Sequence, residues 1–149
     1  LSVSENMMMG NYNKFSHFLM VQKKDINKTA KEEVKSLNIK TPSINQLVKN
    51  LSGGNQQKVV IANWLIKECK ILIFDEPTRG IDVGARSEIY SLMERLVSMG
   101  KSIIMISSDL VEVLRMSDRI LIMSEGKKTG ELDIKGATQD DIMKYATMR

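Results

Sequence analysis

Short apolar runs alternate with amphipathic stretches along most of the chain, a pattern typical of a layered α/β fold. The runs Ile71–Phe74, Ile103–Ile106 and Ile120–Met123 predict strands, the first two fully buried. Residues 84–99 predict an amphipathic helix that ends at Gly100. Its apolar face would consist of Ile89, Leu92, Met93, Leu96 and Val97. Because strands and helices alternate, we expect mostly parallel pairing.

Weaker signals fill in the rest of this region. Residues 56–67 predict a helix with Trp64 in the core, and residues 109–116 and 138–147 predict two shorter helices. Glu125-Gly126 predicts a turn that pairs the third strand with a partner near Thr129–Leu132.

Residues 1–50 are polar and rich in Asn, Lys and Met. Met7–Met9 followed by Gly10 predicts a short helix with a glycine stop. Asp25 is placed to cap a second helix, whose inner face would carry four apolar residues at helical spacing: Ile26, Ala30, Val34 and Leu37.

Composition narrows the class of protein. The 149 residues are 42% apolar and 27% charged, which is typical of a globular domain and excludes disordered and fibrous chains. The net charge of +4 comes from residues 1–50, which hold eight Lys against four acidic residues; this is only a weak nucleic-acid signal. Cys69 is the only cysteine, so no internal disulfide forms and a reducing compartment is favoured. The start at Leu1 predicts a piece of a longer protein.

Two motifs carry candidate chemistry. In Leu51–Lys58, Ser52 and two glycines open a helix, where uncovered N–H groups and the helix dipole suit a phosphate; an ordinary serine-capped helix is the alternative. In Ile71–Pro77, Asp75 and Glu76 follow a strand end, where they could hold Mg²⁺ and polarise a water. A solvated acidic turn is the alternative there.

These residues resemble the ATP-binding cassette (ABC) ATPases. Leu51–Lys58 resembles their signature motif, Ile71–Pro77 their Walker B strand with its catalytic Glu, and Gly80-Ile81-Asp82 their D-loop. The strings LSGGNQQKV and DEPTRGIDVGA resemble the double-cassette ATPases of bacterial ribose, galactose and xylose importers, in the second cassette. The resemblance implies a partial P-loop ATPase core that lacks the phosphate-loop strand, with residues 1–50 in a helical subdomain and 51–149 in the core.

The resemblance also implies roles and cofactors. ATP held by the opposite cassette would meet four residues of the signature motif, which are Ser52, Gly53, Gly54 and Gln56. Asp75 would organise Mg²⁺, Glu76 would act as general base toward the attacking water, and Asp82 would couple the two sites.

The sequence departs from the family pattern twice. No Gly-x-x-x-x-Gly-Lys-[Ser/Thr] loop occurs, so we expect this chain alone to be inactive as an ATPase. Ser108 stands where the family has its switch His, and serine cannot carry positive charge or shuttle a proton near neutral pH. The resemblance therefore implies that Glu76 serves the weaker of two ATP sites.

Partners and location follow from the same resemblance. It implies contact with the protein's own first cassette and with membrane permease subunits, near which Met7–Met9 would lie unless they serve packing instead. It also implies indirect contact with a periplasmic sugar-binding protein, no nucleic acid, and a cytoplasmic position on the inner face of the membrane. Without the phosphate-loop strand, Ile103–Ile106 would pair directly with Ile120–Met123, or the chain would self-associate.

Two other functions stay open on the sequence alone. One is a soluble ABC-type protein acting on ribosomes or DNA, supported only by the basic residues 1–50. The other is a truncated module that only binds or regulates.

Overall fold

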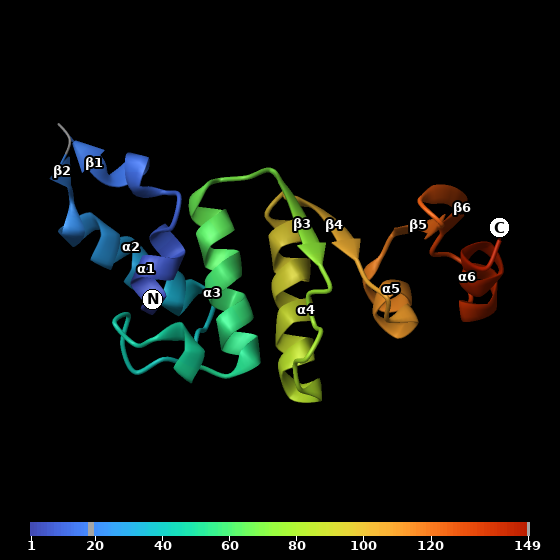
Figure 1. Ribbon diagram of the computed structural model, residues 1–149, viewed down its shortest axis with the longest axis horizontal. Coiled ribbons are helices and arrows are strands. Elements are labelled where there is room, and N and C mark those ends of the chain that lie inside the picture. Colours follow the sequence, from blue (N-terminus) through green and yellow to red (C-terminus); the bar gives the residue numbers. More distant parts are fainter. Residues whose placement is uncertain (18–19, 149) are drawn as a thin grey trace. The chain divides into compact units, whose positions relative to one another are not determined.

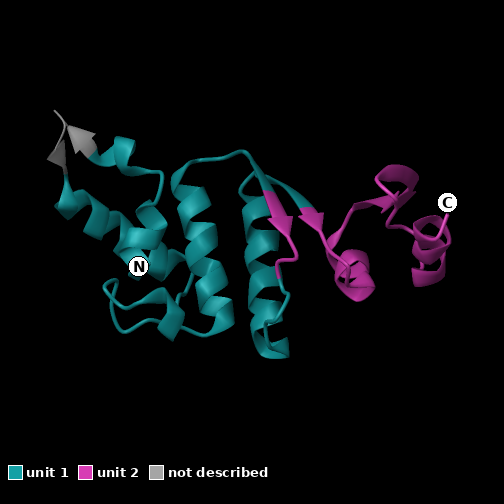
Figure 2. Cartoon of the chain, in the orientation of Figure 1, with its two compact units in different colours: residues 1–72, 78–104 teal, residues 73–77, 105–149 magenta. Residues whose placement is uncertain are grey.

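The structure is a computed structural model that describes residues 1–17 and 20–148 (Figure 1). Two compact units divide it: Leu1–Leu72 with Thr78–Ile104, and Ile73–Pro77 with Met105–Arg149 (Figure 2). We call them unit 1 and unit 2 and describe each by itself.

Unit 1 is mainly helical. Its elements are α1 (Val3–Met8), the 3-10 turn η1 (Tyr12–Phe15), the short strands β1 (Ser16–His17) and β2 (Met20–Val21), α2 (Lys23–Ser36), the 3-10 turn η2 (Val48–Asn50), α3 (Gly53–Ile66) and α4 (Val83–Ser98). The strands β3 (Ile71–Asp75) and β4 (Ser102–Ile106) each begin in unit 1 and end in unit 2.

The short helix α1 is held at both ends. Ser2 and Glu5 form a capping box at its start. At its end, the Asn63 side chain in α3 donates to the carbonyls of Met7 and Met9, at 2.9 and 2.7 Å. Met7 and Met8 are fully buried, so the packing role is confirmed for these two methionines.

Helix α2 begins at Lys23, two residues before the predicted cap. The prediction for Asp25 was wrong, because its N–H already donates to the carbonyl of Gln22 and so lies within the first turn. The predicted inner face is confirmed: two of its residues are buried and two half-buried, namely Ala30, Leu37, Ile26 and Val34.

Helices α3 and α4 form as expected, but two burial predictions in them were wrong. Trp64 is 48% exposed, and the Lys67 ammonium lies 4.2 Å from its ring centroid in a cation–π contact. Val97 is 51% exposed, although its neighbour Leu96 is buried. Gly100 has φ +83°, which confirms the predicted glycine stop after α4.

Strands β3 and β4 pair in parallel. The Ser102 N–H donates to Lys70 O where both begin, and the Glu76 N–H donates to Ile106 O where both end. The expected full burial was wrong: in β3, Phe74 is buried whereas Ile73 is 67% exposed. In the part of the chain that the structure describes, only one face of these strands is covered.

Unit 2 contains α5 (Leu110–Met116), β5 (Arg119–Ser124), β6 (Lys127–Asp133) and α6 (Gln139–Ala146). The predicted hairpin is confirmed: β5 and β6 are antiparallel, and both turn residues, Glu125 and Gly126, have positive φ. The core of the unit is formed by three buried isoleucines, Ile120, Ile122 and Ile142.

The pairing expected between the second and third predicted strands does not form. Among the described residues, β4 pairs with β3 and β5 pairs with β6. Self-association through the unpaired edge of Ile103–Ile106 stays a prediction.

Candidate functional site

The signature segment lies at the start of α3 in unit 1. Ser52 occupies the N-cap position, yet its hydroxyl makes no capping bond to the helix backbone; it accepts from the Asn55 side-chain amide at 2.8 Å. The Gln56 amide donates to Leu51 O at 2.8 Å, and Asn55 Oδ1 accepts from the Lys40 N–H at 2.8 Å. The loop is therefore braced by its amide side chains, while Ser52 remains exposed.

This helix start has the chemistry of an anion site. Gly53 and Gly54 form its first turn, where backbone N–H groups lack intrahelical partners and the helix dipole is positive. Gly53 is exposed, and a Cβ placed on it would meet nothing closer than 3.9 Å. A phosphate group can therefore approach this backbone closely.

The second glycine has a different neighbourhood. Gly54 is buried, and a Cβ on it would lie 2.8 Å from the Ala85 Cβ at the start of α4. Asp82 caps α4, with Oδ1 accepting from the Ala85 N–H at 2.9 Å. The carbonyl of Gly80 lies 3.9 Å from the Cβ position of Gly53. The structure thus brings the predicted signature and D-loop residues together as one packed piece of unit 1.

Lys58 is a residue that sequence reasoning missed. It is only 4% exposed, and its ammonium donates to Glu88 Oε2 at 2.7 Å and to Asn38 O at 3.1 Å. These bonds connect α3 to α4 and to Asn38, two residues after the end of α2. The hydrogen bond from Lys58 and its charge lower the pKa of Glu88. A lysine on the same face as Ile61 and Ala62 was the signal available in the sequence.

The Lys58–Glu88 pair predicts a loss of stability in acid. A carboxyl group whose pKa is lowered by folding stabilises the protein above its ordinary value of 4.5, and this contribution is lost as the pH falls from there through the lowered pKa. Glu88→Gln is expected to remove part of this dependence in urea unfolding measured between neutral and acid pH. Glu94→Gln, on an exposed position of α4, is the matched control. Identical pH profiles for Glu88→Gln and the parent chain would contradict the prediction.

Unit 2 holds the predicted hydrolytic residues. Asp75 ends β3 with an exposed carboxylate, and Glu76 follows in the left-handed region at φ +47°. The Ser108 N–H donates to Glu76 Oε1 at 3.0 Å. Glu76 and Ser108 therefore lie together, as expected. The bond between them uses the backbone amide of Ser108, so it does not depend on which side chain occupies the switch position.

Glu112 is a second residue that sequence reasoning missed. It is 2% exposed, and Glu112 Oε2 accepts a 2.6 Å hydrogen bond from the Ser107 hydroxyl. Ser107 Oγ in turn accepts from the Asp109 N–H at 3.1 Å. This buried carboxyl group fixes the loop that presents the Ser108 amide to Glu76. An acidic residue within the apolar helix 109–116 was its only signal.

The carboxylate at the end of β3 suits a Mg²⁺ ion that keeps several waters better than a metal whose ligands all come from the protein. Among the described residues, no group of three or more His, Cys, Asp or Glu side chains is arranged to hold a metal. Mg²⁺ keeps several waters and takes one or two carboxylates together with substrate phosphates. The exposed Asp75 carboxylate fits that requirement.

Across residues 1–17 and 20–148, no helix is long and apolar enough to cross a membrane.

Comparison with known families identifies the class of protein. The family model described as "ABC transporter" matches residues 1–79, more than half of the chain. The chain therefore belongs to the ABC transporter family.

Within this family, the chain is similar to the ATP-binding proteins of two sugar importers. The chain is 56% identical to the xylose import ATP-binding protein XylG of Thermoanaerobacter pseudethanolicus, over 99% of this chain and 29% of that protein. It is 53% identical to the ribose import ATP-binding protein RbsA of Clostridium tetani, over 98% of this chain and 29% of that protein. The chain thus spans less than a third of the curated relatives it matches.

Solved structures confirm the predicted α/β cassette fold. A metal-chelate type ABC transporter in an inward-facing conformation matches 98% of this chain and 57% of that chain, with a TM-score of 0.82 at 20% identity. A dimeric ATP-binding cassette bound to ADP and Pi matches 90% of this chain and 57% of that chain, with a TM-score of 0.74 at 26% identity.

Proposed function

We propose that this chain is the C-terminal part of the second cassette in the ATP-hydrolysing subunit of a bacterial sugar importer. The observation that carries the proposal is the start of α3, where Ser52 and Gly53 are exposed and the serine hydroxyl is not used for capping. The names of the xylose and ribose import relatives support the transport role.

In this proposal the two groups of residues serve different ATP molecules. Ser52, Gly53 and Gly54 donate to the γ-phosphate of an ATP held by the first cassette, with Gln56 bracing the loop. Bound Mg²⁺ would neutralise charge on the phosphates of the second site. Asp75 would hold that ion, Glu76 would accept a proton from the attacking water, and Asp82 would link the two sites.

The second site is proposed to be the weaker one. Ser108 supplies a backbone N–H to the Glu76 carboxylate but no imidazole. Among the described residues, Glu76 accepts this bond from a neutral amide and forms no ion pair, so its carboxylate lacks a paired cationic group that would share the developing charge. Turnover would then depend on the first site, which uses the signature segment of this chain.

The whole importer subunit provides the test. Ser52→Ala is expected to lower the ATPase rate by on the order of tenfold or more, as loss of a transition-state hydrogen bond does, and Gly54→Asp is expected to lower it further. Glu76→Gln is expected to have the smaller effect. Equal losses, or a larger loss in Glu76→Gln, would refute the assignment of the stronger site.

The domain organisation and partners belong to the same proposal. Residues 1–50 would form part of the helical subdomain and residues 51–149 the core. The subunit would contact membrane permease subunits and its own first cassette at the cytoplasmic face of the membrane, and a periplasmic sugar-binding protein only indirectly. This chain by itself, without a Gly-x-x-x-x-Gly-Lys loop, would not hydrolyse ATP.

A further inference from the structure

Helix α2 presents an exposed row of lysines that the proposed ATP sites do not use. They lie at i, i+4, i+7 and i+11, on an arc of about 60° around the helix and about 16 Å along its axis. We call this row the lysine face; it consists of Lys24, Lys28, Lys31 and Lys35. The opposite side of the helix packs inward through the buried Ala30.

The lysine face has a uniform charge. Asp25 and Glu32 lie on the neighbouring arc, about 60° and 40° around the helix from Lys28, the nearest lysine of the row. Within the described part of the chain, no carboxylate lies within ion-pairing distance of the four lysines. The four ammonium groups therefore form one continuous positive surface that is exposed to solvent.

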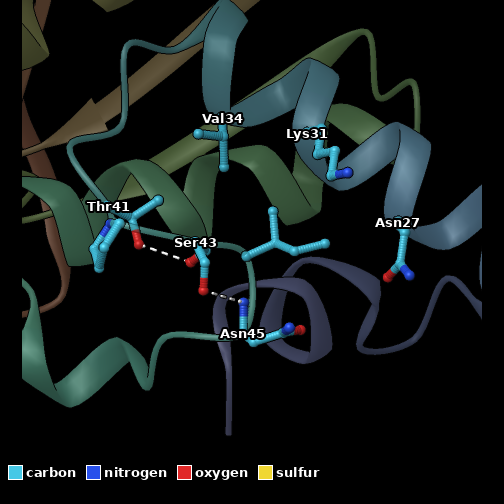
Figure 3. Close-up of a pocket in the computed structure, with 8 residues that line it drawn as sticks. Asn27, Lys31, Val34, Thr41, Ser43 and Asn45 are labelled. Atoms are coloured by element: carbon cyan, nitrogen blue, oxygen red, sulfur yellow. Dashed lines mark hydrogen bonds between the residues drawn. The ribbon is translucent and has the colours of Figure 1, made fainter.

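A cavity borders this face. It has a volume of about 500 Å³, and its wall, from α2 and the following loop, is partly polar and partly apolar (Figure 3). The polar lining residues are Asn27, Lys31, Thr41, Ser43 and Asn45, and the apolar ones are Val34, Pro42 and Ile44. The Thr41 hydroxyl donates to Ser43 O at 2.9 Å, and the Asn45 N–H donates to Ser43 Oγ at 3.2 Å. The loop is thus braced, and the ammonium group of Lys31 and the side-chain amides of Asn27 and Asn45 form the polar part of the cavity wall, where an oxyanion can bind.

We propose that the lysine face binds the anionic phospholipid headgroups of a membrane surface, with one headgroup phosphate in the cavity beside Lys31. A straight row of equal charges complements a flat anionic leaflet. Lysine acts as a point charge toward phosphate. The lysine face holds no apolar side chain, so the helix adsorbs to the surface without inserting.

Nucleic acid is the other polyanion to consider, and the side chains do not favour it. Residues 1–50 contain no arginine, and α2 contains no aromatic residue. Guanidinium groups and stacking aromatics are the usual means of binding bases and phosphates together. The inference does not depend on the proposed ATPase, because headgroup binding requires only this face of unit 1.

Vesicle co-sedimentation of this chain is the test. Binding is expected to phosphatidylcholine vesicles that contain phosphatidylglycerol, not to pure phosphatidylcholine, and high salt is expected to abolish it by screening. The double variant Lys28→Glu, Lys31→Glu is expected to bind at least about tenfold more weakly. The matched control is Lys127→Glu, Lys144→Glu, which changes the net charge equally at exposed positions in unit 2 and is expected to keep binding.

The cavity has its own variant. Asn27→Leu keeps the lysines but replaces an amide at the cavity wall, and we expect severalfold weaker binding. Circular dichroism checks that each variant folds. If Lys28→Glu, Lys31→Glu does not fold, the neutral double variant Lys28→Gln, Lys31→Gln is used in its place. The inference is overturned if phosphatidylglycerol vesicles are not bound, if the unit 2 control loses as much binding, or if a single-stranded RNA is bound more tightly than the vesicles.

Discussion

Gly54→Ala is expected to destabilise unit 1 by about 1–3 kcal/mol, the usual cost of overpacking. In a helix interior the same change ordinarily stabilises by about 0.5–1 kcal/mol, because alanine loses less backbone entropy. Here the new Cβ would lie 2.8 Å from the Ala85 Cβ, well inside contact distance. The start of α3 must therefore move away from the start of α4.

Gly53→Ala is the matched control, one residue away in the same helix. Its Cβ would meet nothing closer than 3.9 Å, so the change is expected to be neutral or mildly stabilising. Urea unfolding followed by the fluorescence of Trp64, the only tryptophan, measures both variants. Adding Ala85→Gly to Gly54→Ala is expected to restore part of the loss. The same sign of change in Gly53→Ala and Gly54→Ala would contradict the packing argument.

This contact affects how signature mutations are interpreted. Gly54 lies against α4, whose cap Asp82 belongs to the D-loop segment. A substitution at Gly54 would therefore disturb both the proposed phosphate contact and the packing of Asp82. Ser52 is exposed and accepts only from the Asn55 side chain in its own loop, so Ser52→Ala isolates the phosphate contact more cleanly.

The elements themselves were predictable because their signals are local. The stop at Gly100 and the turn at Glu125-Gly126 each require positive φ, which glycine adopts readily, and the structure has it in all three residues. The periodicity of α4 is confirmed over its whole length except at Val97.

Burial was harder to predict because it depends on what else packs on an element. The continuous apolar run of β3 indicated cover on both faces, yet Ile73 is exposed and Phe74 is buried. Trp64 was predicted as core because it lies in an apolar helix, but its side of α3 is uncovered by the described residues. A sequence window contains no information about which distant segment covers a face.

The site shows the same division. The motifs indicated Ser52, Asp75 and Glu76 because each residue type has its own chemistry at a strand or helix end. Lys58 and Glu88 are 30 positions apart, and Glu76 and Ser108 are 32 positions apart. Hydrophobic periodicity does not predict hydrogen bonds between residues so distant in sequence. The hydrogen bond between Ser107 and Glu112, only five positions apart, was not predicted for another reason. A lone acidic residue in a short helix usually faces solvent.

Gly130→Ala is expected to be the most damaging small substitution in unit 2. Gly130 lies in β6, opposite Ile122 of β5, and a Cβ on it would lie 2.6 Å from Tyr145 Cγ and 2.8 Å from Cδ1. These atoms are at the base of the ring, close to the α6 backbone, so the whole side chain would have to move. Tyr145 packs against the isoleucine cluster, and we expect a loss of about 2–3 kcal/mol.

Hydrogen exchange of the β5 and β6 amides measures this effect, because a loss of 1.4 kcal/mol lowers protection about tenfold. Tyr145→Ala provides the control background, since it removes the ring that the new methyl group would strike. In that background Gly130→Ala is expected to be neutral or mildly stabilising, because alanine costs less backbone entropy than glycine in a strand. An equal loss of protection in both backgrounds would show that the ring contact is not the reason for glycine at this position.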